Sequence, residues 1–217
     1  MDLFDAAGGS LPPNEALAPG AMILRGFALA RAALLLEDLK KVEAHAPFRQ
    51  MLTPGGFRMS VAMTNCGQFG WVTDRSGYRY DAVDPQTGAA WPAMPASFAA
   101  LAADAASAAG CGEFVPDACL VNRYEPGARM SLHQDRNERD FGQPIVSVSL
   151  GVPATFLFGG LLRSDKPSRV RVAHGDVVVW GGPARLNFHG IMPLRHDDHP
   201  LLGAQRINLT LRKSAAA

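Results

Sequence analysis

The segment IVSVSLGVPATFLF at residues 145–158 decides the fold, because two short runs of β-branched and aromatic residues flank a Gly–Val–Pro turn. Similar runs separated by Gly and Pro turns follow Gly110, at residues 119–124, 129–135, 170–173, 177–180, 187–191 and 207–212. Closely spaced strands of this kind are typical of a β-sandwich or a jelly roll. The sequence therefore predicts an α+β fold that is mainly β, with a sandwich or jelly-roll core over residues 115–213.

Two helices are expected before these strands, where apolar residues recur at helical spacing. The second begins near Ser97, turns Phe98 and Leu101 inward and ends at Gly110. The first covers residues 30–45, and its apolar face consists of Ala33, Leu36, Leu39 and Val42. A short strand is expected at residues 23–27. We expect the helices to support one face of the strand region.

The remaining segments differ in composition from these elements. Residues 1–22 include a stretch rich in Gly, Pro, Ala and Asn, which predicts a flexible arm outside a single domain over residues 23–217. Residues 48–91 mix aromatic residues and arginines with turn formers, and we interpret them as a ribbon-and-loop lid. Aromatic faces beside arginines suit stacked bases and phosphates. The same residues would also serve simply to cover a sheet.

Composition limits the class of protein. The 217 residues are 47% hydrophobic, which is enough for one substantial core. The formal charge of +1 creates no overall positive field for nucleic acid. Three cysteines without a C-x-x-C pair argue against a disulfide framework and cysteine-bound zinc. The acidic start and the lack of an apolar run of about 18 residues predict a cytoplasmic protein without a membrane segment. We expect a monomer.

A metal site is predicted in the run Leu-His-Gln-Asp that ends at residue 135. In a strand, His133 and Asp135 point to the same face, and His189 on a later strand supplies a second imidazole. Such a set occupies one face of an octahedral metal, which suits iron(II) and leaves room for a cosubstrate and dioxygen. His-x-Asp is also a frequent chance tripeptide. The other histidines lie at a helix end, in a turn or in a polar loop: His45, His174, His196 and His199.

The last run, Arg206-Ile-Asn-Leu-Thr-Leu-Arg212, alternates between polar and apolar residues. The ordinary interpretation is an edge strand with its polar face in water. The alternative is that the polar face lines the metal cavity, where two guanidiniums would grip the carboxylates of an acidic cosubstrate. Asn122 and Tyr124 share a face of another strand and would assist, although a tyrosine at this position also suits a core.

The chain resembles the AlkB family of Fe(II)/2-oxoglutarate-dependent dioxygenases that repair alkylated DNA. The resemblance covers about residues 23–212. It rests on runs at residues 122–127, 131–135, 145–151, 174–182 and 206–212, and upstream on residues 48–56 and 59–67, which look like the family's substrate lid.

The resemblance implies a double-stranded β-helix and assigns a role to each site residue. Fe(II) would bind His133, Asp135 and His189, and these residues together with Arg212 would form the catalytic set. The 2-oxoglutarate contacts would be Asn122, Tyr124, Arg206, Asn208 and Arg212. A flipped alkylated base would stack between Trp71 and His133. Phosphates would contact Thr53, Gly55, Arg129, Ser131 and Arg163, and the site would be shaped by Met63, Tyr78 and Trp180.

One residue departs from the family pattern. Asn137 stands where a bacterial relative has an acid that accepts a hydrogen bond from the exocyclic amino group of the base. An amide oxygen also accepts, but it brings no negative charge to favour a cationic base. The resemblance therefore does not fix the base preference.

The resemblance also implies the reaction, in which 1-methyladenine or 3-methylcytosine in single- or double-stranded DNA, or in RNA, is demethylated. Fe(II), 2-oxoglutarate and O2 would be consumed with release of formaldehyde, succinate and CO2. The alternatives are a dioxygenase acting on RNA, a protein or a small molecule, a cupin-like metal-binding module without turnover, and zinc hydrolysis. The paired arginines argue against the module, and the lack of an obvious general-base carboxylate argues against hydrolysis.

Overall fold

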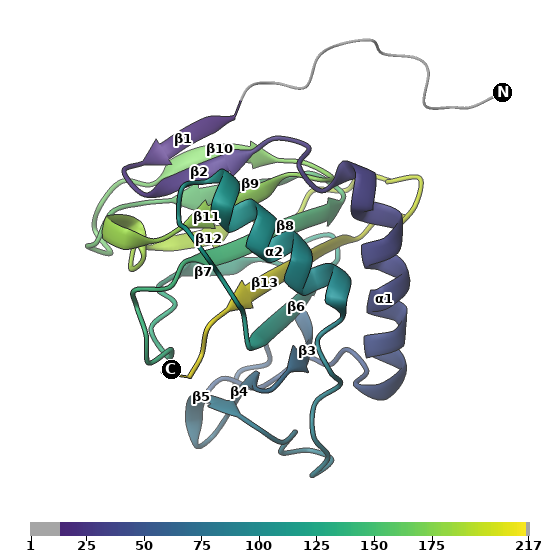
Figure 1. Ribbon diagram of the computed structural model, residues 1–217. Helices are drawn as coiled ribbons and strands as arrows, with labels where there is room; N and C mark the ends of the chain where they lie inside the picture. Colours follow the sequence, from purple (N-terminus) through teal and green to yellow (C-terminus); the bar gives the residue numbers. More distant parts are fainter. Residues whose placement is uncertain (1–13, 216–217) are drawn as a thin grey trace, which may run out of the picture.

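The computed structural model describes residues 14–215, which form two main β-sheets, a β-hairpin and two α-helices (Figure 1). The larger sheet has seven strands in the order β1 (Glu15–Ala18), β2 (Ala21–Leu24), β11 (Val177–Trp180), β8 (Ile145–Gly151), β13 (Arg206–Arg212), β6 (Ala118–Tyr124) and β3 (Ala62–Gly67). The smaller sheet has the order β10 (Ser168–Val172), β9 (Ala154–Phe158), β12 (His189–Ile191) and β7 (Met130–His133). All neighbouring strands in both sheets are antiparallel.

Two apolar clusters lie on opposite faces of the larger sheet. The alternating residues of β13 illustrate the division, because Ile207, Leu209 and Leu211 belong to the cluster shared with the helices. The other cluster contains Trp180 of the larger sheet and Phe156 of the smaller one. The polar residues of β13 are turned away from the helices, toward the smaller sheet. Because alternate residues of a strand point to opposite faces, β13 has one apolar face packed against the helices and one polar face between the sheets.

The helices are α1 (Ala32–His45) and α2 (Ala96–Ala108), which cover the larger sheet (Figure 1). In α2, Phe98 and Leu101 are fully buried, as predicted. In α1 the buried residues are Ala32, Leu35, Leu39 and Val42, so the prediction that Ala33 faces inward was wrong. The 3₁₀ turn η1 (Leu29–Arg31) leads directly into α1. A second 3₁₀ turn, η2, covers Gly182–Ala184.

The expected arm and the expected short strand both differ from the structure. Residues 15–24 form the β1–β2 hairpin, and β2 pairs with β11 in the larger sheet, so the arm does not extend over this part. The main-chain hydrogen bonds of β1 and β2 hold this segment in the sheet, although its composition is rich in turn-forming residues. The strand predicted at residues 23–27 ends at Leu24, because Gly26 adopts a positive φ of 63°. Residues 1–13 of the expected arm lie outside the described residues.

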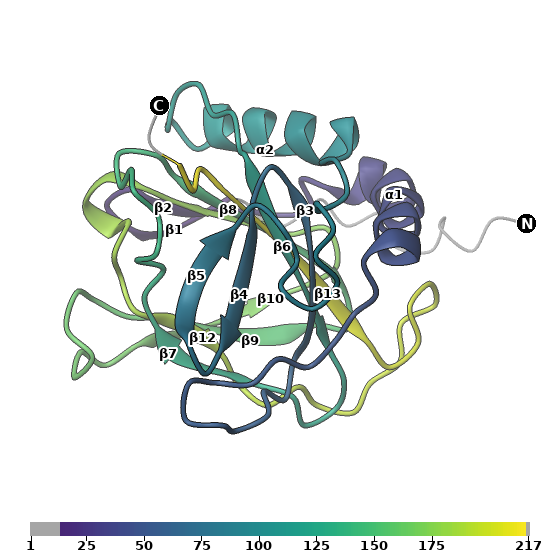
Figure 2. The same cartoon turned by 90° about the horizontal axis from the view of Figure 1, so that it is seen from below.

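The β4–β5 hairpin (Gly70–Asp74 and Gly77–Asp81) belongs to neither sheet. Seen from below in Figure 2, it lies in front of the sheets, between β6 on one side and β7 and β12 on the other. No helix within residues 14–215 is long and apolar enough to cross a membrane.

Candidate active site

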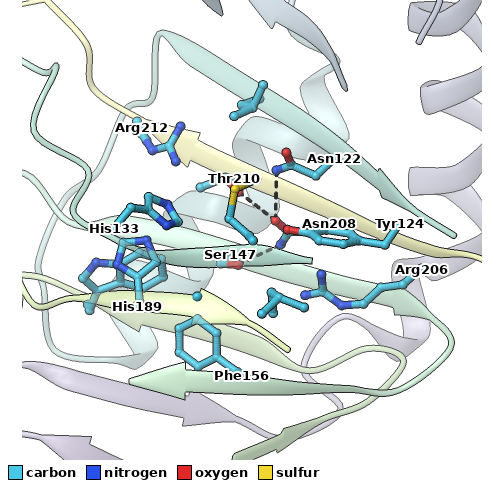
Figure 3. Close-up of a pocket in the computed structure, with 15 residues that line it drawn as sticks. Asn122, Tyr124, His133, Ser147, Phe156, His189, Arg206, Asn208, Thr210 and Arg212 are labelled. Atoms are coloured by element: carbon cyan, nitrogen blue, oxygen red, sulfur yellow. Dashed lines mark hydrogen bonds between the residues drawn. The ribbon is translucent and has the colours of Figure 1, made fainter. Parts of the chain in front are cut away.

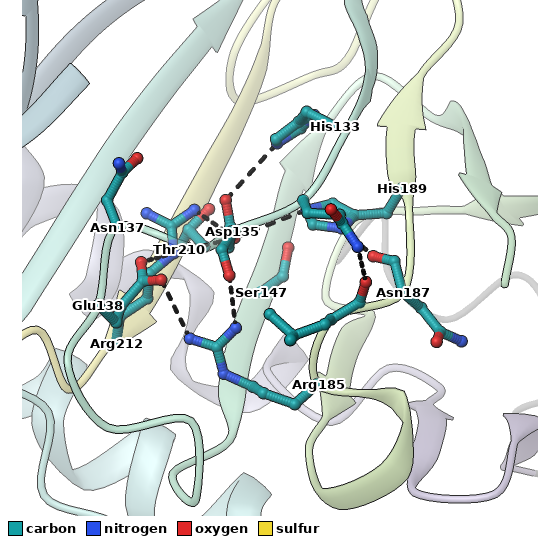
Figure 4. Close-up of polar contacts among 12 residues, drawn as sticks. His133, Asp135, Asn137, Glu138, Ser147, Arg185, Asn187, His189, Thr210 and Arg212 are labelled. Atoms are coloured by element: carbon teal, nitrogen blue, oxygen red, sulfur yellow. Dashed lines mark hydrogen bonds and ion pairs between the residues drawn. The ribbon is translucent and has the colours of Figure 1, made fainter. Parts of the chain in front are cut away.

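The three predicted ligands converge at one end of the space between the sheets. His133 on β7 and His189 on β12 are direct cross-strand partners, and their ring centroids are 4.4 Å apart. Asp135 lies 3.6 Å from the Nε2 atom of each histidine, through Oδ1 to His133 and Oδ2 to His189 (Figure 4). One ligand atom from each residue lies within 4.8 Å of the others, which is compatible with one shared metal ion.

The strand assignments around these ligands need correction. Asp135 lies beyond the end of β7, so it reaches the site from a loop and not from the same strand face as His133. His189 begins β12, so the strand expected at residues 187–191 starts two residues later. Gly190 permits the close approach of the two histidine strands, because a Cβ there would lie 2.7 Å from the carbonyl oxygen of Met130.

Both imidazoles are oriented by backbone carbonyls. Nδ1 of His133 lies 2.9 Å from the carbonyl oxygen of Ser131, and Nδ1 of His189 lies 3.0 Å from that of Asn187. A carbonyl only accepts, so we assign the proton of each ring to Nδ1. Nε2 then keeps its lone pair and faces the carboxylate, the arrangement that metal-binding histidines use.

Electrostatics keep this set in the state that binds metal. Burial and the neighbouring His189 lower the pKa of His133 to about 4, so its ring is neutral near pH 7. Burial opposes ionisation of Asp135, but the guanidinium of Arg212 and the nearby imidazoles outweigh it and hold the carboxyl pKa well below its usual value. A neutral His133 ring and an ionised Asp135 carboxylate are the protonation states that metal binding requires.

A cavity between the sheets extends from the histidines to Arg206 (Figure 3). Arg206 is only 2% exposed, and its one side-chain hydrogen bond, 2.9 Å long, is donated to Ser149 Oγ. Within the described residues, its Nε and Nη1 have no hydrogen-bond partner, and neither does Oδ1 of Asn122. A buried guanidinium without an anion is costly, so the two unpaired N–H positions of Arg206 fit the carboxylate of a cosubstrate. β13 runs between β8 and β6, so the edge-strand interpretation was wrong.

The other predicted cosubstrate residues also line this cavity. Tyr124 is 2% exposed, with the Arg206 guanidinium 5.0 Å from its ring centroid. Asn122 and Asn208 are cross-strand partners, joined by a 3.2 Å hydrogen bond between their amides. Arg212 differs from Arg206, because its Nε and Nη2 donate to Asp135 Oδ2 at 3.0 and 2.7 Å.

Several residues at the site were not predicted. Ser147 and Thr210 hydrogen-bond Asn208 and line the cavity. Glu138 and Arg185 are buried next to Asp135, and Arg185 Nη1 donates to the Asp135 carbonyl at 2.8 Å (Figure 4). Ser147 and Thr210 follow from strand parity, since each lies two residues from a polar neighbour on the same face. Nothing local in the sequence marks Glu138 or Arg185.

Trp180 lines the cavity, whereas Trp71 and Tyr78 lie on the β4–β5 hairpin. Trp71 and Tyr78 stack across the β4–β5 hairpin with centroids 5.6 Å apart. Trp71 Nε1 donates to Asn137 Oδ1 at 3.2 Å, which connects the hairpin to the ligand loop. Trp180 lines the cavity with its centroid 4.9 Å from that of His189. Met63 is fully buried in the core beneath, so it supports the site instead of facing a ligand.

The predicted phosphate contacts lie mostly on exposed loops. Gly55, Arg129, Ser131 and Arg163 are exposed, while Thr53 is partly buried and its Oγ1 accepts a hydrogen bond from the backbone of Phe57. Arg163 donates to the carbonyl of Leu132, next to the ligand His133. It therefore lies next to a predicted metal ligand, and its phosphate contact stays a prediction.

Comparison with known proteins agrees with this geometry. A family model described as "2OG-Fe(II) oxygenase superfamily" matches residues 20–212. The chain is 57% identical to the alpha-ketoglutarate-dependent dioxygenase AlkB of Escherichia coli, covering 99% of this chain and 98% of that protein. The chain belongs to the AlkB family. Family membership makes it a dioxygenase that uses Fe(II), 2-oxoglutarate and O2, which the donor set above fits.

More distant relatives keep the same fold. A DNA N(6)-methyladenine demethylase of Arabidopsis thaliana, ALKBH1C, is 34% identical over 62% of this chain and 35% of its own length. The solved structure of OsALKBH1 superimposes with a TM-score of 0.82 at 29% identity, covering 93% of this chain and all of that one. OsALKBH1 therefore shares this mostly β architecture at 29% identity.

Proposed function

We propose that this enzyme demethylates N-alkylated bases in DNA, and in RNA as a second substrate, with 1-methyladenine and 3-methylcytosine as substrates. Formaldehyde, succinate and CO2 are the expected products. The observation that carries the proposal is the contact of Trp71 with the metal-ligand loop, because its indole N–H donates to Asn137 Oδ1, two residues after the metal ligand Asp135. A flipped base stacks on such a face, and cation–π attraction favours a cationic base.

The finer fold assignment belongs to the same proposal. Strands β6 to β13 pass between the two sheets in the order that a double-stranded β-helix requires, with β6, β8, β11 and β13 in one sheet and β7, β9, β10 and β12 in the other. We assign residues 48–91 as the nucleotide-recognition lid and α1 and α2 as its supporting helices. The single domain over residues 23–217, the monomeric state and the cytoplasmic location stay predictions.

The residues divide the work by their contacts. His133, Asp135 and His189 would hold Fe(II), which with O2 and 2-oxoglutarate supplies the oxidising chemistry. Arg206, with donors that lack protein partners, would bind the carboxylate far from the metal. Arg212 already holds Asp135, so it orients this ligand and offers its remaining N–H to the carboxylate near the metal. Trp71, His133 and Trp180 enclose the base and exclude water, which strengthens every polar contact inside.

Asn137 affects which base is preferred. Its Oδ1 accepts from Trp71, so its amide N–H groups remain for a ligand. Thr53, Gly55, Arg129, Ser131 and Arg163 stay the proposed backbone contacts, because phosphates position a strand without reading its sequence. Met63 and Tyr78 support the Trp71 side of the site.

The test is reconstitution of the protein with Fe(II) under anaerobic conditions, followed by 2-oxoglutarate, air and an oligonucleotide containing 1-methyladenine. We expect equal amounts of formaldehyde and succinate, and no formaldehyde from a His133→Ala variant. A parallel RNA oligonucleotide measures the nucleic-acid preference. Iron-loaded protein that releases no formaldehyde from either oligonucleotide would contradict the proposal and favour a metal-binding module or another substrate.

A further inference from the structure

A buried hydrogen-bonded chain connects the β4–β5 hairpin to the metal ligand Asp135. Tyr80 Oη donates to Glu138 Oε1 at 2.6 Å, and Glu138 Oε2 accepts from Arg185 Nη2 at 3.2 Å. Arg185 also donates to the carbonyl of Asp135, while Arg212 donates to the Asp135 carboxylate and, at 3.4 Å, to Tyr80 Oη. The side chain of Glu138 is 1% exposed, so no bulk water replaces these contacts.

Charge balance does not require the tyrosine. Arg185 and Arg212 bring two positive charges, and Asp135 and Glu138 bring two negative charges, so the ionic groups are already matched. Burial raises the pKa of Tyr80 well above its usual value, which keeps its hydroxyl protonated as a donor. The tyrosine therefore adds a connection to the hairpin, not a compensating charge.

The connection reaches the surface on which the base would stack. Tyr80 and Trp71 are cross-strand partners in the hairpin, so their side chains lie on one face. The ligand loop meets both, because Asn137 accepts from Trp71 and Glu138 accepts from Tyr80, two and three residues after Asp135. Residues 135–138 thus carry the metal ligand Asp135 and both residues that hydrogen-bond the hairpin, Asn137 and Glu138.

We propose that Tyr80 and Glu138 are positioning residues. Their hydrogen bond couples the position of the Trp71 ring on the hairpin to the conformation of the loop that carries the metal ligand Asp135. The expected change in product ratio rests on the proposed function, whereas the expected change in hydrogen exchange of the hairpin does not. If binding at the metal and cosubstrate site tightens the Asp135 loop, the hairpin tightens with it, and thermodynamic linkage makes the effect reciprocal. A base held at the wrong distance would leave 2-oxoglutarate consumption without demethylation.

The experiment uses Tyr80→Phe, which removes one hydroxyl and keeps the ring. Hydrogen–deuterium exchange of residues 70–81 is compared between metal-free protein and protein loaded with Zn(II) and 2-oxoglutarate. In the wild type we expect loading to slow exchange in the hairpin. In Tyr80→Phe the slowing should be lost there and retained at residues 206–212. Equal slowing of the hairpin in both proteins would overturn the proposal, whatever the substrate is.

The kinetic readout is the ratio of succinate to formaldehyde with a methylated oligonucleotide. In Tyr80→Phe we expect this ratio to rise at least threefold and kcat to fall about tenfold, as loss of a hydrogen bond to a charged group predicts. Glu138→Gln should give a similar defect, and the double variant should be no worse than the worse single one. Additive defects would refute the coupling.

Arg79→Ala is the matched control. Arg79 is next to Tyr80 on β5, and its ion pairs with Asp74 and Asp81 stay within the hairpin. We expect this variant to keep both the exchange response and the product ratio. An equal defect in Arg79→Ala would show that general weakening of the hairpin explains the result and would overturn the assignment to Tyr80 and Glu138.

Discussion

Replacing Arg206 by methionine should stabilise the protein without cosubstrate and abolish its response to 2-oxoglutarate. The guanidinium is 2% exposed and keeps one hydrogen bond to Ser149 and a ring contact with Tyr124. Burial lowers the pKa of Arg206, as expected for a cation without an anion. Replacing buried ionic groups by apolar residues of similar size is often stabilising by about 1–4 kcal/mol. Loss of the Tyr124 contact offsets about 1 kcal/mol of this gain.

The expected shifts follow from these values. The net gain is therefore about 0–3 kcal/mol, and each kcal/mol raises the Tm of a chain of this size by about 2–4 °C. In the wild type, 2-oxoglutarate at 100 times its Kd adds about 2.7 kcal/mol, or about 5–10 °C. We expect this ligand-dependent shift to disappear in Arg206→Met.

The measurement is thermal unfolding with Mn(II), with and without 2-oxoglutarate. Arg49→Met is the matched control, because Arg49 is a largely buried arginine that has a carboxylate partner, with both its Nη atoms 2.5 Å from Asp84. The control should lose stability and keep the ligand-dependent shift. The reasoning is refuted if Arg206→Met is destabilised like the control, or if it still responds to 2-oxoglutarate.

Three further predictions concern acidity, base preference and the core. His133 has a pKa of about 4 in the fold and about 6.5 when unfolded, so protonation favours the unfolded chain, and the unfolding free energy of metal-free protein should fall as pH drops from about 6.5 to 4. Urea unfolding at several pH values checks this, and a His133→Ala variant with the same pH slope would contradict it. Asn137→Asp should raise kcat/KM for cationic 1-methyladenine relative to the neutral lesion 1-methylguanine by about fivefold, and competition between the two oligonucleotides measures the ratio. Phe98→Ala should lower the unfolding free energy by about 3–5 kcal/mol without changing the Kd of 2-oxoglutarate, because Phe98 is fully buried under the opposite face of the larger sheet.

Local patterns in the sequence were sufficient for the strands and for the chemistry of their faces. The alternation at residues 206–212 separates an apolar face from a polar one, and the structure confirms both faces. His133, Asp135 and His189 were also identified from residue type and spacing. The inferences about strand faces succeed because side-chain direction in a strand alternates with the parity of the residue, whereas Asp135 reaches the site from a loop.

Contacts between distant segments were decided only by the tertiary structure. The register that places His189 opposite His133, the loop position of Asp135 and the sheet pairing of residues 15–24 depend on partners far away in the chain. The sequence also treated Arg206 and Arg212 alike, since both lie on the polar face. Their difference arises because Asp135, 77 residues before Arg212, folds against one guanidinium and leaves the other without an anion. Such long-range pairing has no local periodicity that a sequence could reveal.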